Sequence, residues 1–241
     1  MLPKSTLATI TLATLGVALF CGLGVWQLHR AEQKRALHQQ FLAAADLPVQ
    51  PLESLPLESA PLWRQASVTG AFTDLTVLLD NRVRNGRLGY EVYTVFKPDQ
   101  GEPLLVNRGW IAAGASRAEW PAIQTPTARQ TLEGRLAPPP STGIRLGGAV
   151  QFEALAPGRW RTQHLDDAGL RAALGVPLRA YTLLMASPDT EGLSRDWSLP
   201  EADDGKHTAY AVQWFAFAGI AIGLALRALL RQQKKEPASR D

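Results

Sequence analysis

The sequence predicts a membrane protein in which two transmembrane α-helices flank a mainly β soluble domain. Three observations support this fold class. Residues 5–28 and residues 208–226 are long apolar stretches without an acidic or basic side chain. The segment between them, residues 29–206, contains short runs rich in β-branched and aromatic residues, separated by glycine and asparagine turns. That segment is long enough to form one domain with its own core.

The second apolar stretch is the clearer membrane span. No charged side chain occurs between Thr208 and Leu226. At 1.5 Å per residue, the step from His207 to Arg227 covers about 30 Å, which is the thickness of the hydrocarbon core of a bilayer. We therefore predict a transmembrane helix over residues 208–226.

The first apolar stretch predicts another span over residues 5–28, which begins after Lys4 and ends at His29. A cleaved signal peptide is the alternative, but no small-x-small cleavage site follows the apolar core closely. We interpret the segment as an uncleaved anchor, in which Cys21 is a packed thiol.

Small residues four positions apart predict a surface on which the two spans pack closely. Gly219 and Gly223 form such a pair in the second span, and Ala18 and Gly22 form one in the first. Small residues allow helix backbones to approach each other in a membrane.

The charge distribution indicates the orientation of the chain. Of 25 basic and 22 acidic residues, the tail over residues 227–241 holds five and two, which leaves 20 of each in the remainder. A basic flank is typical of the cytoplasmic end of a membrane helix, so we predict a cytoplasmic tail and both termini on that side. Arg30, Lys34 and Arg35 favour the opposite orientation for the first helix. Because the remainder is neutral, the sequence gives little support to nucleic-acid binding.

The segment between the spans begins with a helical extension and a connector. The first helix is expected to continue through residues 31–37 and to end before Pro48. Prolines at 48, 51, 56 and 61 then predict an extended connector.

Strands are predicted beyond the connector, at residues 65–72, 75–80, 90–96, 104–107, 131–136 and 180–185. Asn85-Gly86 and Gln100-Gly101 are turn signals between them. Residues 166–174 predict a helix that starts at Asp166 or Asp167 and stops at Gly175. The regular spacing of short strands favours an antiparallel sheet or a small barrel in an α+β domain. The proline-rich and glycine-rich residues 138–148 predict a loop.

Several classes of site are excluded or lack their motifs. One cysteine excludes intramolecular disulfides, a multi-cysteine zinc site and a CxxCH haem attachment. The sequence contains no HExxH, GxSxG or P-loop motif, and no GxGxxG after a strand. We therefore do not predict an enzyme.

Five segments resemble the signature segments of the Surfeit locus protein 1 family. They are Gly24-Val-Trp26-Gln27-Leu-His-Arg30, Val68-Thr-Gly70-Ala-Phe72, Gly89-Tyr90-Glu-Val-Tyr-Thr94, Leu105-Val-Asn107-Arg108-Gly109-Trp110-Ile111 and His207-Thr-Ala-Tyr210-Ala-Val-Gln-Trp214-Phe215. Their order, with a helix at each end, covers nearly the whole chain. Two positions depart from the family pattern: Val95 replaces the proline that usually follows the glycine-tyrosine strand, and Lys206 stands where an asparagine commonly precedes the histidine.

The resemblance implies a bacterial inner-membrane protein with a periplasmic main domain that acts in the assembly of cytochrome c oxidase. It implies that the protein binds or presents haem a for the core subunit of the oxidase. The implied partners are that subunit, the machinery that synthesises haem a, and membrane lipids. Delivery and protection of haem both remain open. The alternative is a haem-free membrane scaffold that stabilises an assembly intermediate.

The candidate site lies where the second span begins. His207, Tyr210 and Trp214 follow each other at i, i+3 and i+7, so they share one stripe of a helix. A neutral imidazole is a suitable iron ligand, and the two aromatic rings could cover a porphyrin face. An interfacial histidine with an aromatic belt is the alternative explanation.

The end of the first span contributes further candidates. Trp26 and Gln27 match the family motif and could pack against Tyr210 and Trp214, or they could anchor the helix at the interface. Arg30 could pair with a haem propionate, as could Arg108, although interfacial arginines also meet lipid phosphates. His29 is a conceivable second iron ligand. We expect the segment Asn107–Trp110 to be mainly structural, with Gly109 permitting a bend.

Overall fold

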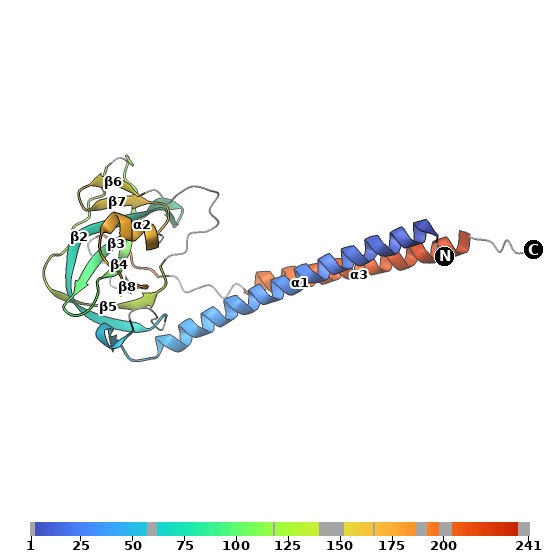
Figure 1. Cartoon of the computed structure of the whole chain (residues 1–241), viewed down its shortest axis with the longest axis horizontal. Coiled ribbons are helices and arrows are strands. Elements are labelled where there is room, and N and C mark those ends of the chain that lie inside the picture. Colours follow the sequence, from blue (N-terminus) through green and yellow to red (C-terminus); the bar gives the residue numbers. More distant parts are fainter. Residues whose placement is uncertain are drawn as a thin grey trace, which may run out of the picture. The chain divides into compact units, whose positions relative to one another are not determined.

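The computed structural model describes residues 3–56, 62–117, 119–139, 152–165, 167–186, 192–197 and 204–235. Two long apolar helices near the two ends of the chain flank a mixed-sheet domain, as the sequence predicts (Figure 1). The chain divides into two compact units, Met1–Gln39 with Leu199–Asp241 and Gln40–Ser198.

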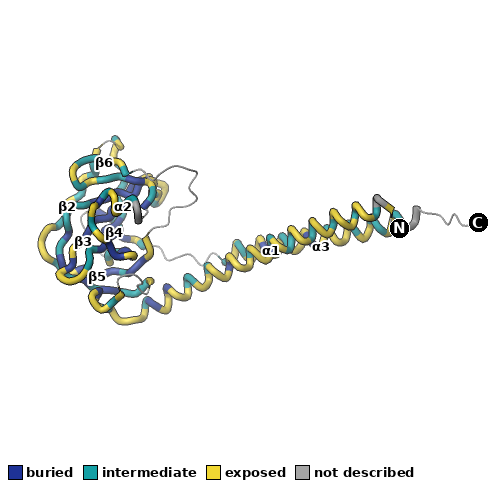
Figure 2. Tube along the Cα trace, viewed as in Figure 1, coloured by how far each residue is buried: buried dark blue, intermediate teal, exposed yellow. Residues whose placement is uncertain are grey.

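The first unit is a pair of long helices. Helix α1 (Lys4–Ala45) continues beyond the apolar stretch and ends before Pro48. A proline disfavours helical backbone at the residue that precedes it. Helix α3 (Asp204–Lys235) contains the second apolar stretch. Both are long and apolar enough to cross a membrane, and most of their surface is exposed (Figure 2).

The two helices pack antiparallel along one stripe of each. Thr6 Oγ1 donates to Gln232 Oε1 at 2.8 Å, and at the other end Arg35 pairs with Asp204 at 2.8 Å. The shielded positions of α3 recur at alternating spacings of three and four, and five of them are alanines: Ala211, Ala218, Ala221, Ala225 and Ala228. On α1, Gly24 and Ala31 are buried seven residues apart. These spacings are those of an antiparallel coiled coil with small residues in its seam.

The seam does not use the small residues that the sequence suggested. A Cβ atom added at Gly22, Gly219 or Gly223 would meet no atom within 4 Å, and Ala18 is exposed. At Gly24, by contrast, a Cβ atom would lie 2.7 Å from the Phe215 ring. The two spans therefore pair as expected, but through a seven-residue repeat and not through the two four-residue pairs.

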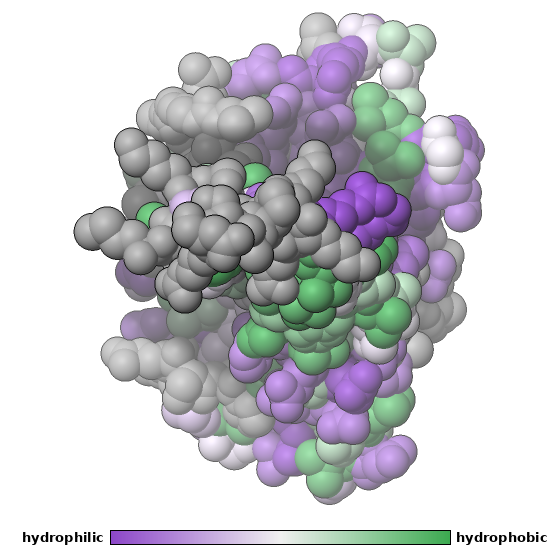
Figure 3. Space-filling model, turned by 90° about the vertical axis from the view of Figure 1, so that its right-hand side faces the viewer, coloured by the Kyte–Doolittle hydropathy of each residue, from purple (hydrophilic) through white to green (hydrophobic). Residues whose placement is uncertain are grey.

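Large apolar side chains cover the outer faces of the pair. They include Leu12, Leu15 and Leu19 on α1 and Ile220, Leu224 and Leu226 on α3, all of which are exposed. Figure 3 looks along the pair and shows hydrophobic residues, in green, on the flank that the grey atoms leave visible. Exposed apolar surface of this extent is expected where lipid tails surround a helix.

The second unit is built around one long strand. Strand β2 (Gln65–Arg84) joins the two strands predicted at 65–72 and 75–80. It pairs with β3 (Arg87–Pro98), and a register shift after Phe72 marks the point where the sequence pattern breaks. Asn85 and Gly86 both have positive φ, 50° and 73°, which a two-residue hairpin turn requires. The predicted turn is confirmed.

Three further strands close a ring with β2 and β3. They are β4 (Leu104–Ala112), β5 (Gln130–Ala137) and β8 (Thr182–Met185). The pairings run β2–β3, β3–β4, β4–β8, β8–β5 and β5–β2, which returns to the starting strand. This closed circuit agrees with the small-barrel alternative.

The sheet is mixed and not entirely antiparallel. Strand β1 (Gln50–Pro51), which precedes the short 3-10 helix η1 (Leu52–Ser54), pairs parallel to β2, and β4 pairs parallel to β8. Strands β6 (Glu153–Ala156) and β7 (Arg159–Thr162) extend the sheet beyond β2, with β7 parallel to it. The sequence pattern did not predict β1, β6 or β7, which have four residues or fewer each.

Of three core clusters among the described residues, the two larger ones lie on the two sides of the ring, and the third joins Leu78, Tyr90, Val92 and Leu193. The first takes residues from all five ring strands, including Phe72, Phe96, Val106, Leu132 and Leu183, so it fills the interior. The second joins Val77, Tyr93 and Leu105 to Leu170 and Leu174 of helix α2 (Asp167–Leu174). Helix α2 ends as predicted, with Gly175 at φ 65° and its N–H bonded to the Arg171 carbonyl. Asp166, and most of the predicted loop at 138–148, lie outside the described residues.

Gly89 shows why one motif glycine is required. A Cβ atom at this position would clash with the Ile111 carbonyl oxygen and lie 2.5 Å from the Trp110 ring of the neighbouring strand. We expect Gly89→Ala to lower the free energy of unfolding by about 3 kcal/mol, because overpacking forces the strands apart. Denaturant titration of the full chain in detergent, followed by tryptophan fluorescence, measures this change.

Gly114→Ala is the matched control. A Cβ atom added at Gly114 meets nothing within 4 Å. Equal unfolding free energies for the two variants would contradict the packing explanation.

Candidate functional site

A histidine and a glutamine meet across the seam of the helix pair. His207 on α3 and Gln27 on α1 are both half-buried, and His207 Nδ1 lies 2.7 Å from Gln27 Oε1. Gln27 lies near the C-terminal end of the first apolar stretch, and His207 immediately precedes the second. The antiparallel packing brings them together, because Gln27 follows Gly24 in the seam of α1 and His207 precedes Ala211 in the seam of α3.

This contact fixes what the imidazole can do. When Gln27 Oε1 accepts, Nδ1 carries the proton and donates it, and Nε2 keeps its lone pair. An imidazole held by its second nitrogen in this way is the usual arrangement of a metal-ligating histidine. An imidazole in this state is of a chemical type that fits haem iron, because Nε2 keeps its lone pair while Gln27 holds Nδ1.

The aromatic residues of the site divide into two groups. Trp214 lies in the seam, stacked on Phe20 with ring centroids 5.9 Å apart and packed edge-on against Phe217. Trp26 and Tyr210 instead expose 55% and 53% of their surface. Trp214 thus stabilises the pair, whereas Trp26 and Tyr210 are free to contact a ligand or lipid. The sequence reasoning missed Phe20, although its spacing of seven from Gln27 places it on the same stripe.

The basic candidates occupy different environments. Arg30 is exposed, and its guanidinium donates to Gln33 at 3.0 Å, so it remains accessible to a carboxylate. Arg108 is fully buried in the domain and is not accessible to a propionate. His29 is exposed and two residues from Gln27, which is about 200° around a helix, so it points away from the seam.

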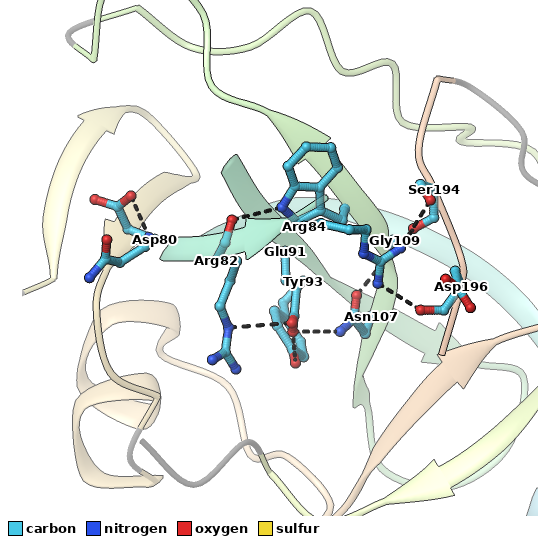
Figure 4. A network of polar contacts seen from close by, with 11 residues as sticks. Asp80, Arg82, Arg84, Glu91, Tyr93, Asn107, Gly109, Ser194 and Asp196 are labelled. Atoms are coloured by element: carbon cyan, nitrogen blue, oxygen red, sulfur yellow. Dashed lines mark hydrogen bonds and ion pairs between the residues drawn. The ribbon is translucent and has the colours of Figure 1, made fainter. Parts of the chain in front are cut away.

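The motif segments of the domain form a polar network on β2, β3 and β4 (Figure 4). The Glu91 carboxylate accepts from the Tyr93 hydroxyl at 2.9 Å and from the Asn107 amide at 3.0 Å, and it pairs with Arg82 at 3.3 Å. Burial, followed by the negative charge of Glu91, raises the pKa of Tyr93 well above its usual value. Tyr93 therefore stays neutral at physiological pH and donates to the carboxylate.

Arg108 and Gly109 form an irregular step within β4. Val92 pairs with Gly109 and Tyr93 with Asn107, so Arg108 is the extra residue of a bulge. Gly109 has φ 133°, which favours glycine, and its N–H donates to Asn107 Oδ1 at 3.1 Å. The predicted bend is confirmed, although the strand continues to Ala112 and does not end there.

The bulge also holds the chain segment Leu193–Trp197. Arg195 Nε donates to the Arg108 carbonyl at 2.7 Å, and Trp110 exchanges backbone hydrogen bonds with Ser194. Arg84 donates to the Ser194 hydroxyl at 2.9 Å and to the Asp196 carbonyl at 2.8 Å (Figure 4). The next described element along the chain is α3. The structural role expected for Asn107–Trp110 is thus supported by its contacts.

Comparison with known proteins identifies the family. The model of the SURF1 family matches residues 14–219, which include most of α1, the domain and the first half of α3. A SURF1-like protein of Mycobacterium tuberculosis is 28% identical over 228 residues, which cover 91% of this chain and 82% of the relative. A SURF1-like protein of Rickettsia bellii is 27% identical over 236 residues, covering 88% of this chain and 92% of the relative. The chain belongs to the SURF1 family.

Proposed function

We propose that this protein holds haem a at its helix pair during the assembly of cytochrome c oxidase. The SURF1 family is a cytochrome c oxidase assembly family, and the two candidate spans agree with a membrane protein. The observation that carries the haem proposal is the 2.7 Å contact between His207 Nδ1 and Gln27 Oε1. It supports an imidazole with its second nitrogen directed to a ligand.

The side chains at this end of the pair have complementary tasks. His207 Nε2 coordinates the iron, and Gln27 fixes the tautomer and the orientation of the ring. Trp26 and Tyr210 cover the macrocycle, for which their exposed rings are suited. Arg30 pairs with a propionate through its two-pronged guanidinium. The apolar outer faces of the helices suit the hydrocarbon tail of haem a.

The haem is cargo in this proposal, so no turnover by the protein is expected. The core subunit of the oxidase receives the haem, or is protected while it is loaded. The basic residues that follow residue 226 support a cytoplasmic position for both termini and a periplasmic position for the domain in a bacterial inner membrane.

A haem-free scaffold is the second candidate function. The observation that favours it is the same hydrogen bond, because a histidine and a glutamine in a seam also clip two helices together. A haem-free variant that still restores oxidase assembly in cells lacking this protein would support the scaffold and reject the haem proposal.

The test uses protein purified in detergent from cells that make haem a. We expect wild-type protein to carry haem a and His207→Ala to lose at least about nine-tenths of it, because the iron loses its ligand. His29→Ala is the matched control, since it removes an exposed histidine near the same end of the helix pair. Circular dichroism checks that both variants keep their helices. Unchanged haem content in His207→Ala would reject the ligand role.

A further inference from the structure

A groove runs along α3 at the end that carries the basic residues. It is lined by Gly223, Leu226, Arg227, Leu230 and Arg231 and has a volume of about 320 Å³. The spacing of these residues places them on one helical face. Its lining begins with Gly223 and Leu226 and continues with Arg227, Leu230 and Arg231, so the two basic residues lie in the half nearer the tail.

This face points away from α1. The seam positions of α3 in this region are Ala221, Ala225 and Ala228. Gly223 is two residues from both Ala221 and Ala225, which is about 200° around the helix. The groove therefore opens on the side of α3 opposite the helix partner.

Gly223 makes no close approach to another described residue that would require a glycine. A glycine within a helix costs about 1 kcal/mol relative to alanine. A Cβ atom at Gly223 would meet nothing within 4 Å, so the glycine does not serve a close approach to α1. Its effect is to leave the surface open about one turn before Leu226.

The two arginines favour a ligand that carries a negative charge. Arg227 and Arg231 are exposed and one turn apart, and the sequence has no acidic residue between Asp204 and Glu236. Arg227 is the first charged residue after the apolar stretch, and Gly223 lies about 6 Å deeper along the helix. The groove thus crosses the level at which phosphate groups meet acyl chains.

We propose that this groove binds an anionic phospholipid. The phosphate lies between the guanidinium groups of Arg227 and Arg231, which suit phosphate oxygens, and one acyl chain runs from there past Leu226 and over Gly223. A transmembrane helix of another protein fits less well, because its apolar surface would leave the two cations without a partner. This lipid site is separate from His207 and does not depend on the haem proposal.

A comparison on α1 supports the specificity of the site. Leu7, Ala8, Thr11, Leu12 and Leu15 line a larger groove of about 450 Å³, but none of them is charged. That groove accommodates acyl chains of any lipid. We expect the groove on α3 to select an anionic headgroup and the groove on α1 not to do so.

The test is native mass spectrometry of the full chain, mixed in detergent with palmitoyl-oleoyl phosphatidylglycerol or phosphatidylcholine. We expect the wild type to retain one phosphatidylglycerol at least about ten-fold more strongly than phosphatidylcholine. The double variant Arg227→Gln/Arg231→Gln loses this preference. Gly223→Leu loses the bound phosphatidylglycerol although both arginines remain.

Two control variants separate a built site from general effects. Lys234→Gln/Lys235→Gln removes the same charge from the tail, and Gly22→Leu adds the same side chain at an open position of α1. Both are expected to bind phosphatidylglycerol like the wild type, and glycerol phosphate is not expected to compete. The proposal would be overturned if Gly223→Leu retained the lipid or if the lysine variant lost it equally. It would also be overturned if glycerol phosphate competed or if a co-purified membrane protein displaced the lipid.

Discussion

Replacing Arg108 by alanine is expected to lower the free energy of unfolding by about 3–5 kcal/mol, the range of the largest core truncations. The Arg108 side chain is fully buried. Its guanidinium donates to the Thr125 hydroxyl at 2.9 Å and to the Gln124 carbonyl, and it lies 5.2 Å from the centre of the Phe72 ring. The substitution opens a cavity and removes both hydrogen bonds and the contact with the Phe72 ring.

A conservative variant and a surface variant sharpen this prediction. Arg108→Lys keeps the charge but lacks the planar fork, so we expect it to recover only part of the loss. Arg129 also makes a close ion pair, with Asp99, but on the surface. Arg129→Ala is expected to leave the melting temperature unchanged. Thermal unfolding of the three variants in detergent measures the contrast, and a stable Arg108→Ala protein would contradict the buried role.

Replacing Gln27 by leucine is expected to weaken haem binding by about 10–100-fold, the usual cost of losing a group that orients a metal-bound histidine. Leucine has a similar size but cannot accept the hydrogen bond from His207 Nδ1. The haem that remains is also expected to change its reduction potential, because the imidazole loses its hydrogen-bond partner. Haem content and potentiometric titration of the purified protein give both quantities.

The acceptor itself can be tested by restoring it. Gln27→Glu keeps an oxygen at the same position, so we expect it to recover haem binding and to lower the reduction potential below that of the wild type. Gln213→Leu is the control, because Gln213 is an exposed glutamine of α3. Normal haem content and potential in Gln27→Leu would mean that Gln27 only joins the helices.

The architecture of the domain was predictable where local patterns decide it. The turn at Asn85-Gly86 and the helix stop at Gly175 both depend on positive φ angles that the sequence announces. The parallel pairings of β1, β7 and β8 were not predictable, because they depend on long-range closure of the ring. Two predicted strands merged into β2 because a register shift lets one strand continue past the irregular residues.

Only the α3 residues of the candidate site were predictable as a group. The stripe of His207 and Trp214 follows from helical spacing, but the partner of His207 depends on how two separate helices align. Once the antiparallel seam is known, Gln27 and Phe20 follow from their spacing of seven. The pairs Ala18/Gly22 and Gly219/Gly223 misled because small residues four apart lie off a seven-residue seam. Arg108 misled because its burial depends on the fold of the whole domain.

Optical spectroscopy of the His207→Ala variant with and without added imidazole tests the central claim most directly. If His207 Nε2 is the iron ligand, the variant loses the haem spectrum of the wild type, and free imidazole in the vacated position restores it. A wild-type spectrum from His207→Ala without imidazole would contradict the assignment of the iron ligand.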